Sequence, residues 1–159
     1  MSVDSAALCR MLQSEKEALT VFTTLLREEQ QTLVRGELER LGSYADSKSN
    51  CLFKLTHLGE QRHGLLRERA LHCDDAGMES LLRDHVENPE LPRAAWRHIV
   101  ELAKTAKHLN EINGTLIGTR LNSTQEALSV LFCAAKLPGA YTADGSTVCY
   151  RPTHKLAVA

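Results

Sequence analysis

Apolar side chains recur at helical spacing along the first segment of the chain, from about Asp4 to Arg35. They are separated by steps of three, four and seven residues, and charged or amide side chains fill the positions between them, as on a helix with one buried face. The apolar positions are Leu8, Met11, Leu12, Leu19, Phe22, Leu25, Leu26, Leu33 and Val34. Gly36 predicts a kink or tight turn, because glycine costs about 1 kcal/mol relative to alanine inside a helix.

The second segment, residues 37–71, alternates steps of three and four, an a/d heptad pattern typical of knobs-into-holes packing. The expected seam is Leu38, Leu41, Ala45, Lys48, Leu52, Leu55, Gly59, Arg62 and Leu66. A basic seam residue extends to solvent or pairs with a carboxylate of the facing helix. Because a turn near Gly36 would make the two helices antiparallel, Glu28 and Glu29 are candidate partners.

Residues 72–92 interrupt the helical pattern with several helix-breaking residues, including Gly77, Pro89 and Pro92. Within them, residues 79–86 could form two helical turns with three apolar side chains on one side. These side chains are Leu81, Leu82 and Val86. We therefore expect a connector that contains a short helix.

The third long segment begins at Pro92 and continues to about Lys136 in the same three-four rhythm. The middle of its seam is polar, with Asn110, Asn113 and Arg120 at positions where apolar side chains would pack better. Polar seam residues lower stability and commonly fix register. They can also mark a surface that accepts a partner.

The distal part of this segment offers an apolar stripe that could receive an amphipathic helix. If the first two helices cover only part of the third, this stripe stays exposed, and an exposed apolar patch marks an interaction site. Packing on the connector or on a second copy of the chain, as a homodimer, is the alternative. The predicted partner-binding residues are Asn113, Ile117, Leu121, Leu128, Leu131 and Phe132.

Leu137-Pro138-Gly139 ends the third helix, and few large apolar residues follow it. Asp144-Gly145 is a type I′ hairpin signal, although an isolated hairpin is marginal in water. The tail is therefore either a frayed terminus or a docking peptide that orders on binding. We predict a helical bundle domain over residues 1–137 and a flexible tail over residues 138–159.

Composition narrows the function classes. Aromatic residues make up only 4% of the 159 residues, which suits narrow helix-helix seams filled by Leu and Ala. The net charge of −1 lacks the basic excess that nucleic-acid binders use, so no nucleic acid is expected. No apolar run is long enough for a membrane span, and the N-terminus lacks signal-peptide features. We expect a cytoplasmic protein without stable membrane insertion.

The sequence contains no complete catalytic or metal-binding motif of the kinds considered. No phosphate-binding glycine loop, dinucleotide fingerprint, nucleophile elbow or His-Glu-x-x-His is present. Glu60-Gln-Arg-His63 matches half of a di-iron bundle motif, but such a site needs a second copy on another helix. The five cysteines lack metal or dithiol spacing, and the seven histidines lack ligand spacing. We therefore expect no enzyme activity, no cofactor and no metal.

Two stretches carry a resemblance to a known family. The first is Leu109-Asn-Glu-Ile-Asn-Gly-Thr-Leu-Ile-Gly-Thr-Arg-Leu-Asn-Ser-Thr-Gln-Glu-Ala-Leu128, and the second is Tyr141-Thr-Ala-Asp-Gly145. In this order they resemble the FlgN family of flagellar type III export chaperones. Weaker agreement continues upstream in Glu29-Gln-Gln-x-Leu33, in Lys48 with Leu52, and in Glu60-Gln-Arg62. Thr142 stands where the family tail commonly has glycine.

The resemblance implies an all-α chaperone with three long amphipathic helices in an antiparallel coiled-coil-like bundle. Such a chaperone would bind the C-terminal amphipathic helices of hook-associated (hook-filament junction) proteins, prevent their premature assembly and deliver them to the export gate. Docking to the cytoplasmic domain of the gate protein would fall to Tyr141. The alternatives are a structural coiled-coil protein that only self-associates and a metalloprotein on a ferritin-like bundle.

Overall fold

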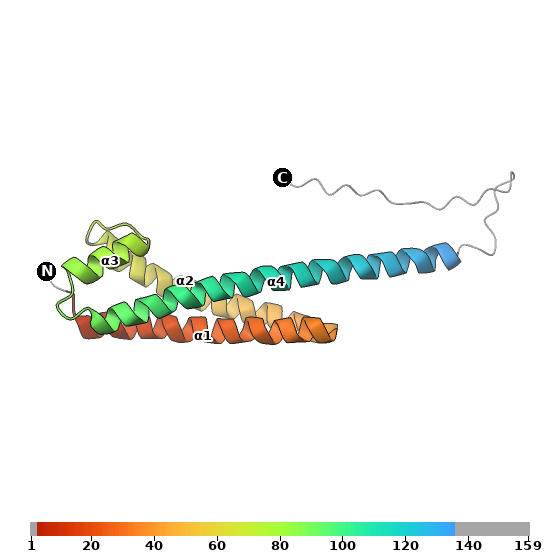
Figure 1. The fold of residues 1–159 in the computed structure, drawn as a ribbon, viewed down its shortest axis with the longest axis horizontal. Helices are drawn as coiled ribbons and strands as arrows, with labels where there is room; N and C mark the ends of the chain where they lie inside the picture. Colours follow the sequence, from red (N-terminus) through yellow and green to blue (C-terminus); the bar gives the residue numbers. More distant parts are fainter. Residues whose placement is uncertain (1–2, 136–159) are drawn as a thin grey trace. The chain divides into compact units, whose positions relative to one another are not determined.

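The computed structural model describes residues 3–135 and the side chains of residues 3–131. These residues form α1 (Ser5–Arg35), the short 3-10 helix η1 (Leu38–Arg40), α2 (Leu41–Arg67), α3 (Asp75–Asp84) and α4 (Glu90–Ala135) (Figure 1). The predicted all-α fold, with three long helices and a short connecting helix, is confirmed. The predicted domain boundary at residues 137 and 138 and the tail lie outside the described residues.

The chain divides into two compact units, residues 1–117 and 118–159, and α4 runs through the division. In the first unit, α1 and α2 are antiparallel, because Glu15 pairs with Arg62 while Thr32 lies beside Tyr44. Residues 90–117 of α4 are parallel to α1, since Trp96 lies beside the Arg62–Glu15 pair and Asn113 bonds to the carbonyl oxygen of Leu26. Figure 1 shows these three long helices side by side.

Both ends of α1 are capped, and its C-terminal end lies at Gly36, where a turn was predicted. The Asp4 carboxylate accepts a hydrogen bond from the Ala6 amide at 3.0 Å and satisfies one free donor of the first turn. At the other end Gly36 has a φ of 80°, and its amide donates to the carbonyl oxygens of Thr32 and Leu33. This left-handed conformation is strained for residues with a Cβ, so glycine ends the helix and starts the turn.

The core of the first unit forms two clusters along the bundle. The larger one gathers side chains from α1, α2, α3 and α4 around Leu12, Leu66, Met78, Leu82 and Ile99. The smaller one joins Phe22 and Leu26 of α1 to Ala106 of α4, with half-buried residues of α2 and α4 packed against it. Apolar burial of this kind is the main favourable term in folding. The expected buried face of α1 is therefore largely confirmed, although Val34 is exposed.

The seam of α2 differs from the expected one in its first half. Lys48, Leu55 and Arg62 face the bundle as expected, but Tyr44 and Cys51 accompany them in place of Ala45 and Leu52, which are exposed. Leu38 is exposed as well. Ala45 and Tyr44 are three and four residues before Lys48 and lie on opposite sides of it on the helix surface. The periodicity alone is therefore compatible with either residue in the seam. Tyr44 is buried on the side where it lies beside Thr32 of α1.

The connector helix α3 is longer than the two turns expected. It begins at the Asp74 cap, whose carboxylate accepts a hydrogen bond from the Gly77 amide at 2.8 Å. Leu81, Leu82 and Val86 are buried together, as predicted. The Val3 amide donates to the His85 carbonyl at 2.7 Å, so the start of the chain is joined to the end of the connector.

Candidate partner-binding surfaces

Of the polar residues predicted in the middle of the seam, Asn113 belongs to a buried cluster in the first unit, whereas Asn110 is exposed. Asn113 is 1% exposed, and its amide nitrogen donates to the Leu26 carbonyl and to the Glu29 carboxylate, both at 2.8 Å. Glu29 also pairs with Lys48 at 2.7 Å, which confirms the expected partner of this seam lysine. The amide nitrogen of Asn113 is thus occupied inside the bundle, and the contact of this residue with a partner protein stays a prediction.

A second buried polar cluster lies nearer the start of α1. The Arg62 guanidinium makes two hydrogen bonds to the Glu15 carboxylate, at 3.1 and 3.2 Å, and lies 4.7 Å from the centre of the Trp96 ring. Trp96 in turn donates to Asp75 at 2.7 Å. The burial of Glu15 was not predicted from the sequence. The available signal was its position between Leu12 and Leu19, on the apolar face of α1.

In the second unit, the described part of α4 carries exposed leucines on one face. Leu121, Leu128 and Leu131 are 58%, 47% and 64% exposed. At 3.6 residues per turn they fall within an arc of about 80°, which we call the distal stripe. Phe132 and Tyr141 lie outside the part of the chain whose side chains the structure describes. Ile117, the remaining predicted site residue, is half-buried at the end of the first unit.

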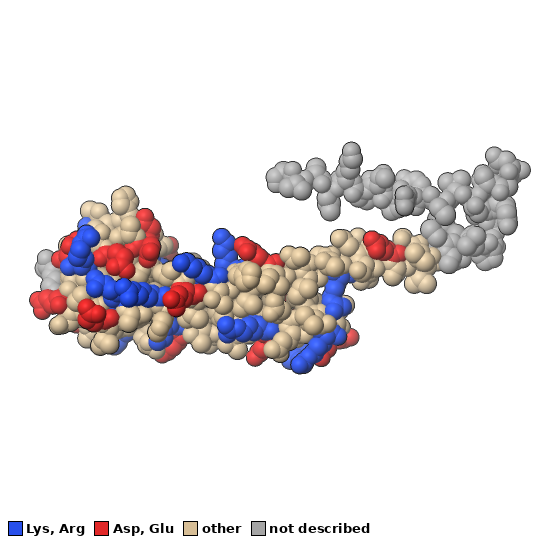
Figure 2. All heavy atoms as spheres, viewed as in Figure 1, with Lys and Arg blue, Asp and Glu red and all other residues tan. Residues whose placement is uncertain are grey.

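The surface around the distal stripe is nearly free of charge. Between residues 118 and 135 the sequence has only two charged residues, Arg120 and Glu126. Figure 2 shows this end of α4 as mostly uncharged, whereas Lys, Arg, Asp and Glu cover much of the first unit. A soluble helix usually exposes charged side chains, so contiguous exposed leucines with few charges mark an interaction surface.

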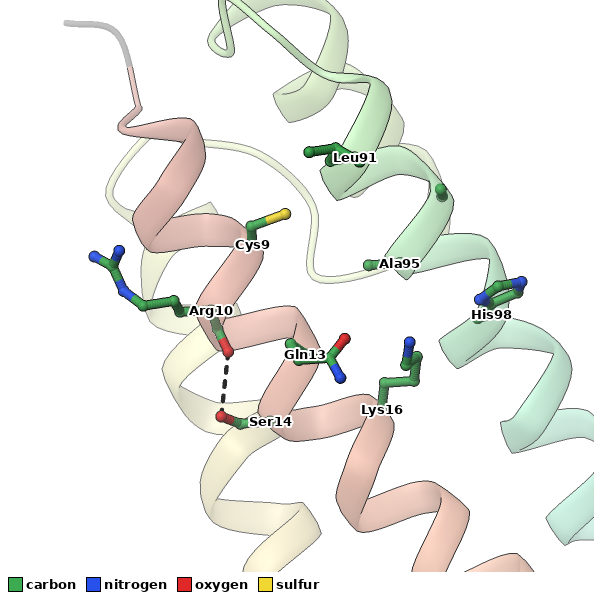
Figure 3. Close-up of a pocket in the computed structure, with 9 residues that line it drawn as sticks. Cys9, Arg10, Gln13, Ser14, Lys16, Leu91, Ala95 and His98 are labelled. Carbon is green, nitrogen blue, oxygen red and sulfur yellow. Dashed lines mark hydrogen bonds between the residues drawn. The ribbon is translucent and has the colours of Figure 1, made fainter.

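A hollow of about 680 Å³ lies between α1 and the start of α4 in the first unit. Figure 3 shows Cys9, Gln13 and Lys16 of α1 directed toward the side that carries Leu91, Ala95 and His98 of α4. We call these six residues and the space between them the α1–α4 groove. Arg10 and Ser14 also line the hollow, but in Figure 3 their side chains point away from α4.

The described residues show neither a metal-binding group nor a helix that could span a membrane. In the described part of the chain, no group of three or more His, Cys, Asp or Glu residues could hold a metal ion. None of the helices there has the length and apolarity that crossing a bilayer requires. Cys9, Cys51 and Cys73 are free thiols.

Comparisons with known proteins agree with the resemblance in the sequence. Residues 1–148 match the family described as FlgN protein. A curated relative, Flagella synthesis protein FlgN of Proteus mirabilis, is 27% identical over 136 residues, which cover 84% of this chain and 85% of that protein. A crystal structure from Pseudomonas aeruginosa, provisionally described as a flagella synthesis protein FlgN, has a TM-score of 0.66. It is 25% identical and covers 81% of this chain and 98% of that chain.

Proposed function

Because the chain belongs to the FlgN family, we propose that it serves flagellar synthesis as a cytoplasmic export chaperone. Its cargo would be the C-terminal amphipathic helices of the hook-filament junction proteins. The chaperone would keep these segments from assembling prematurely and deliver them to the export gate. It acts by holding a polypeptide, with no chemical step.

The exposed distal stripe is the observation that carries this proposal. An amphipathic helix recognises its partner through apolar side chains at spacings of three, four and seven residues. Leu121, Leu128 and Leu131 repeat at steps of seven and three, so they match such a cargo helix. Burying these side chains would remove the exposed apolar surface from water in both proteins, and that is the principal driving force of association.

Self-association is the second candidate, and the same heptad spacing supports it. A second copy of the chain could cover the distal stripe and form a homodimer, without any role in export. The two candidates differ in what happens when cargo is added. If the chain is a chaperone, the added cargo binds the distal stripe and a complex of chaperone and cargo forms. If the chain is a purely structural coiled coil, it remains a homodimer.

Co-purification with the cargo segments tests the proposal directly. The full chain is expected to retain the C-terminal segments of the hook-filament junction proteins on an affinity column, in a complex that light scattering resolves from either component. Circular dichroism and a cooperative melt establish that the chaperone is folded under the same conditions. If the folded chain retains neither segment and elutes only as a homodimer, the chaperone proposal is wrong.

Docking to the export gate is assigned to Tyr141, by resemblance to the family tail motif. Replacing Tyr141 with alanine is expected to weaken binding to the gate protein's cytoplasmic domain about tenfold or more, since a buried tyrosine is a common interface hot spot. Cargo retention should stay unchanged, because the distal stripe is intact. Tyr150→Ala is the matched control in the same segment. Joint loss of gate and cargo binding in Tyr141→Ala would contradict the assignment.

A further inference from the structure

The α1–α4 groove is a hollow that the facing helices leave unfilled. Cys9 and Ala95 are short side chains, and Gln13 and Lys16 are flexible ones with polar ends. The hollow is an open depression on the surface of the first unit, so the residues that line it are accessible to a partner. A volume of about 680 Å³ is within the range of sites that bind ligands or side chains of a partner.

The two ends of the groove differ in polarity. At one end Leu91 is 74% exposed and lies near Ala95 and Cys9. At the other end are Lys16 of α1 and His98 of α4 (Figure 3). The apolar end favours a large apolar side chain, and the basic end favours an anionic group. A ligand for the whole groove must therefore be amphipathic.

The charge at the basic end has no counterpart in the groove. The chain has 20 acidic and 19 basic residues, yet no carboxylate lines the hollow. Glu17 accepts a hydrogen bond from Gln13 at 2.9 Å, and Lys16 forms no ion pair within the described residues. Charge complementarity across an interface selects partners and sets their register. The groove is thus complementary to an acidic partner.

We propose that the α1–α4 groove binds a helical segment of a protein partner that presents a large apolar side chain and, two turns away, a carboxylate. Cys9 and Lys16 are seven residues apart on α1, as are Leu91 and His98 on α4. Seven residues span about 10 Å along a helix, so the partner's two side chains stand at positions i and i+7. This site lies in the first unit and does not depend on cargo binding at the distal stripe.

Two synthetic helical peptides test the proposal on the full-length chain. One carries leucine at position i and glutamate at i+7, and the other has lysine in place of that glutamate. Titration of the isotope-labelled protein is expected to shift the amide signals of residues 9–16 and 91–98 with the glutamate peptide. The lysine peptide is expected to bind about tenfold more weakly or not at all, because it places like charges together.

Charge reversal then identifies the cation involved. Lys16→Glu should reverse the preference, so that the lysine peptide binds and the glutamate peptide is lost. Lys54→Glu changes an exposed lysine of α2 and is expected to bind like the unmodified chain. Leu91→Ser removes the apolar contact, so it should weaken binding of the glutamate peptide to the unmodified chain and of the lysine peptide to Lys16→Glu. Val21→Ser changes another exposed apolar position of the first unit and should weaken neither.

Three results would overturn the proposal. The first is no binding of the glutamate peptide to the unmodified chain. The second is that each peptide binds Lys16→Glu as tightly as it binds the unmodified chain, while the remaining amide signals show that the variant is folded. The third is a set of shifts at residues 118–131 only, which would place the peptide on the distal stripe. Cargo retention can succeed or fail independently of each of these results.

Discussion

Replacing Leu128 and Leu131 together with serine is expected to abolish retention of the hook-filament junction segments while the melting temperature stays unchanged. Both side chains are exposed, so their removal takes nothing from the core. Full burial of one leucine side chain contributes about 1.5–3 kcal/mol. Because both side chains are already about half covered in the free chain, losing the two contacts weakens cargo binding about twentyfold or more. Titration calorimetry with a junction-protein segment measures the change.

Val130 provides the matched control for this experiment. It is 67% exposed on the same stretch of α4 but lies about 160° around the helix from Leu128. Val130→Ser should therefore retain cargo as the unmodified chain does. Equal weakening by Val130→Ser, or full retention by the double serine variant, would show that the distal stripe does not hold the cargo.

Replacing Glu15 with alanine is expected to lower the free energy of unfolding by about 3–5 kcal/mol, the typical cost of leaving one partner of a buried ion pair alone. Arg62 would lose both of its hydrogen bonds while its side chain is only 12% exposed. The contact with the Trp96 ring would remain, but it satisfies none of the guanidinium donors. Urea denaturation followed by circular dichroism measures this loss.

Two further variants distinguish the unpaired charge from a loss of packing. Replacing both Glu15 and Arg62 with leucine should restore most of the stability, because no charge is then left without its partner. Glu60→Ala removes one partner of the exposed Glu60–Arg67 pair and should cost less than about 1 kcal/mol. If the double leucine variant were as unstable as Glu15→Ala, the loss of stability would have to come from poorer packing and not from an unpaired charge.

The ends of α1 could be predicted because they depend on local chemistry, whereas α3 begins earlier than predicted and α4 begins at Glu90 rather than at Pro92. Asp4 and Gly36 act on backbone groups within one turn of themselves, so the bounds of α1 follow from the sequence alone. The seam of α2 depends on distant neighbours. Lys48 and Leu55 were placed correctly, but the choice between Tyr44 and Ala45 required the position of α1, which a heptad pattern does not contain.

The candidate site shows the same division. A basic residue in a seam extends to solvent or pairs with a carboxylate, and the antiparallel turn made Glu28 and Glu29 the candidate partners; the structure pairs Lys48 with Glu29. The stripe of Leu121, Leu128 and Leu131 was also visible as a pattern, but exposure depends on what covers a helix. The same pattern in the first unit faces inward at Asn113, so periodicity could not separate buried residues from exposed ones.

The bond between Asn113 and Glu29 also has a consequence for the order of folding. It joins residues 84 positions apart, whereas the contact of Thr32 with Tyr44 spans only 12. Closing a longer loop costs more entropy, and folding slows as contacts become more distant in sequence. We expect α1 and α2 to pair first as a hairpin on a growing nascent chain. The helix α4 would then dock late, when Asn113 reaches the Glu29 carboxylate in the hairpin that has already formed.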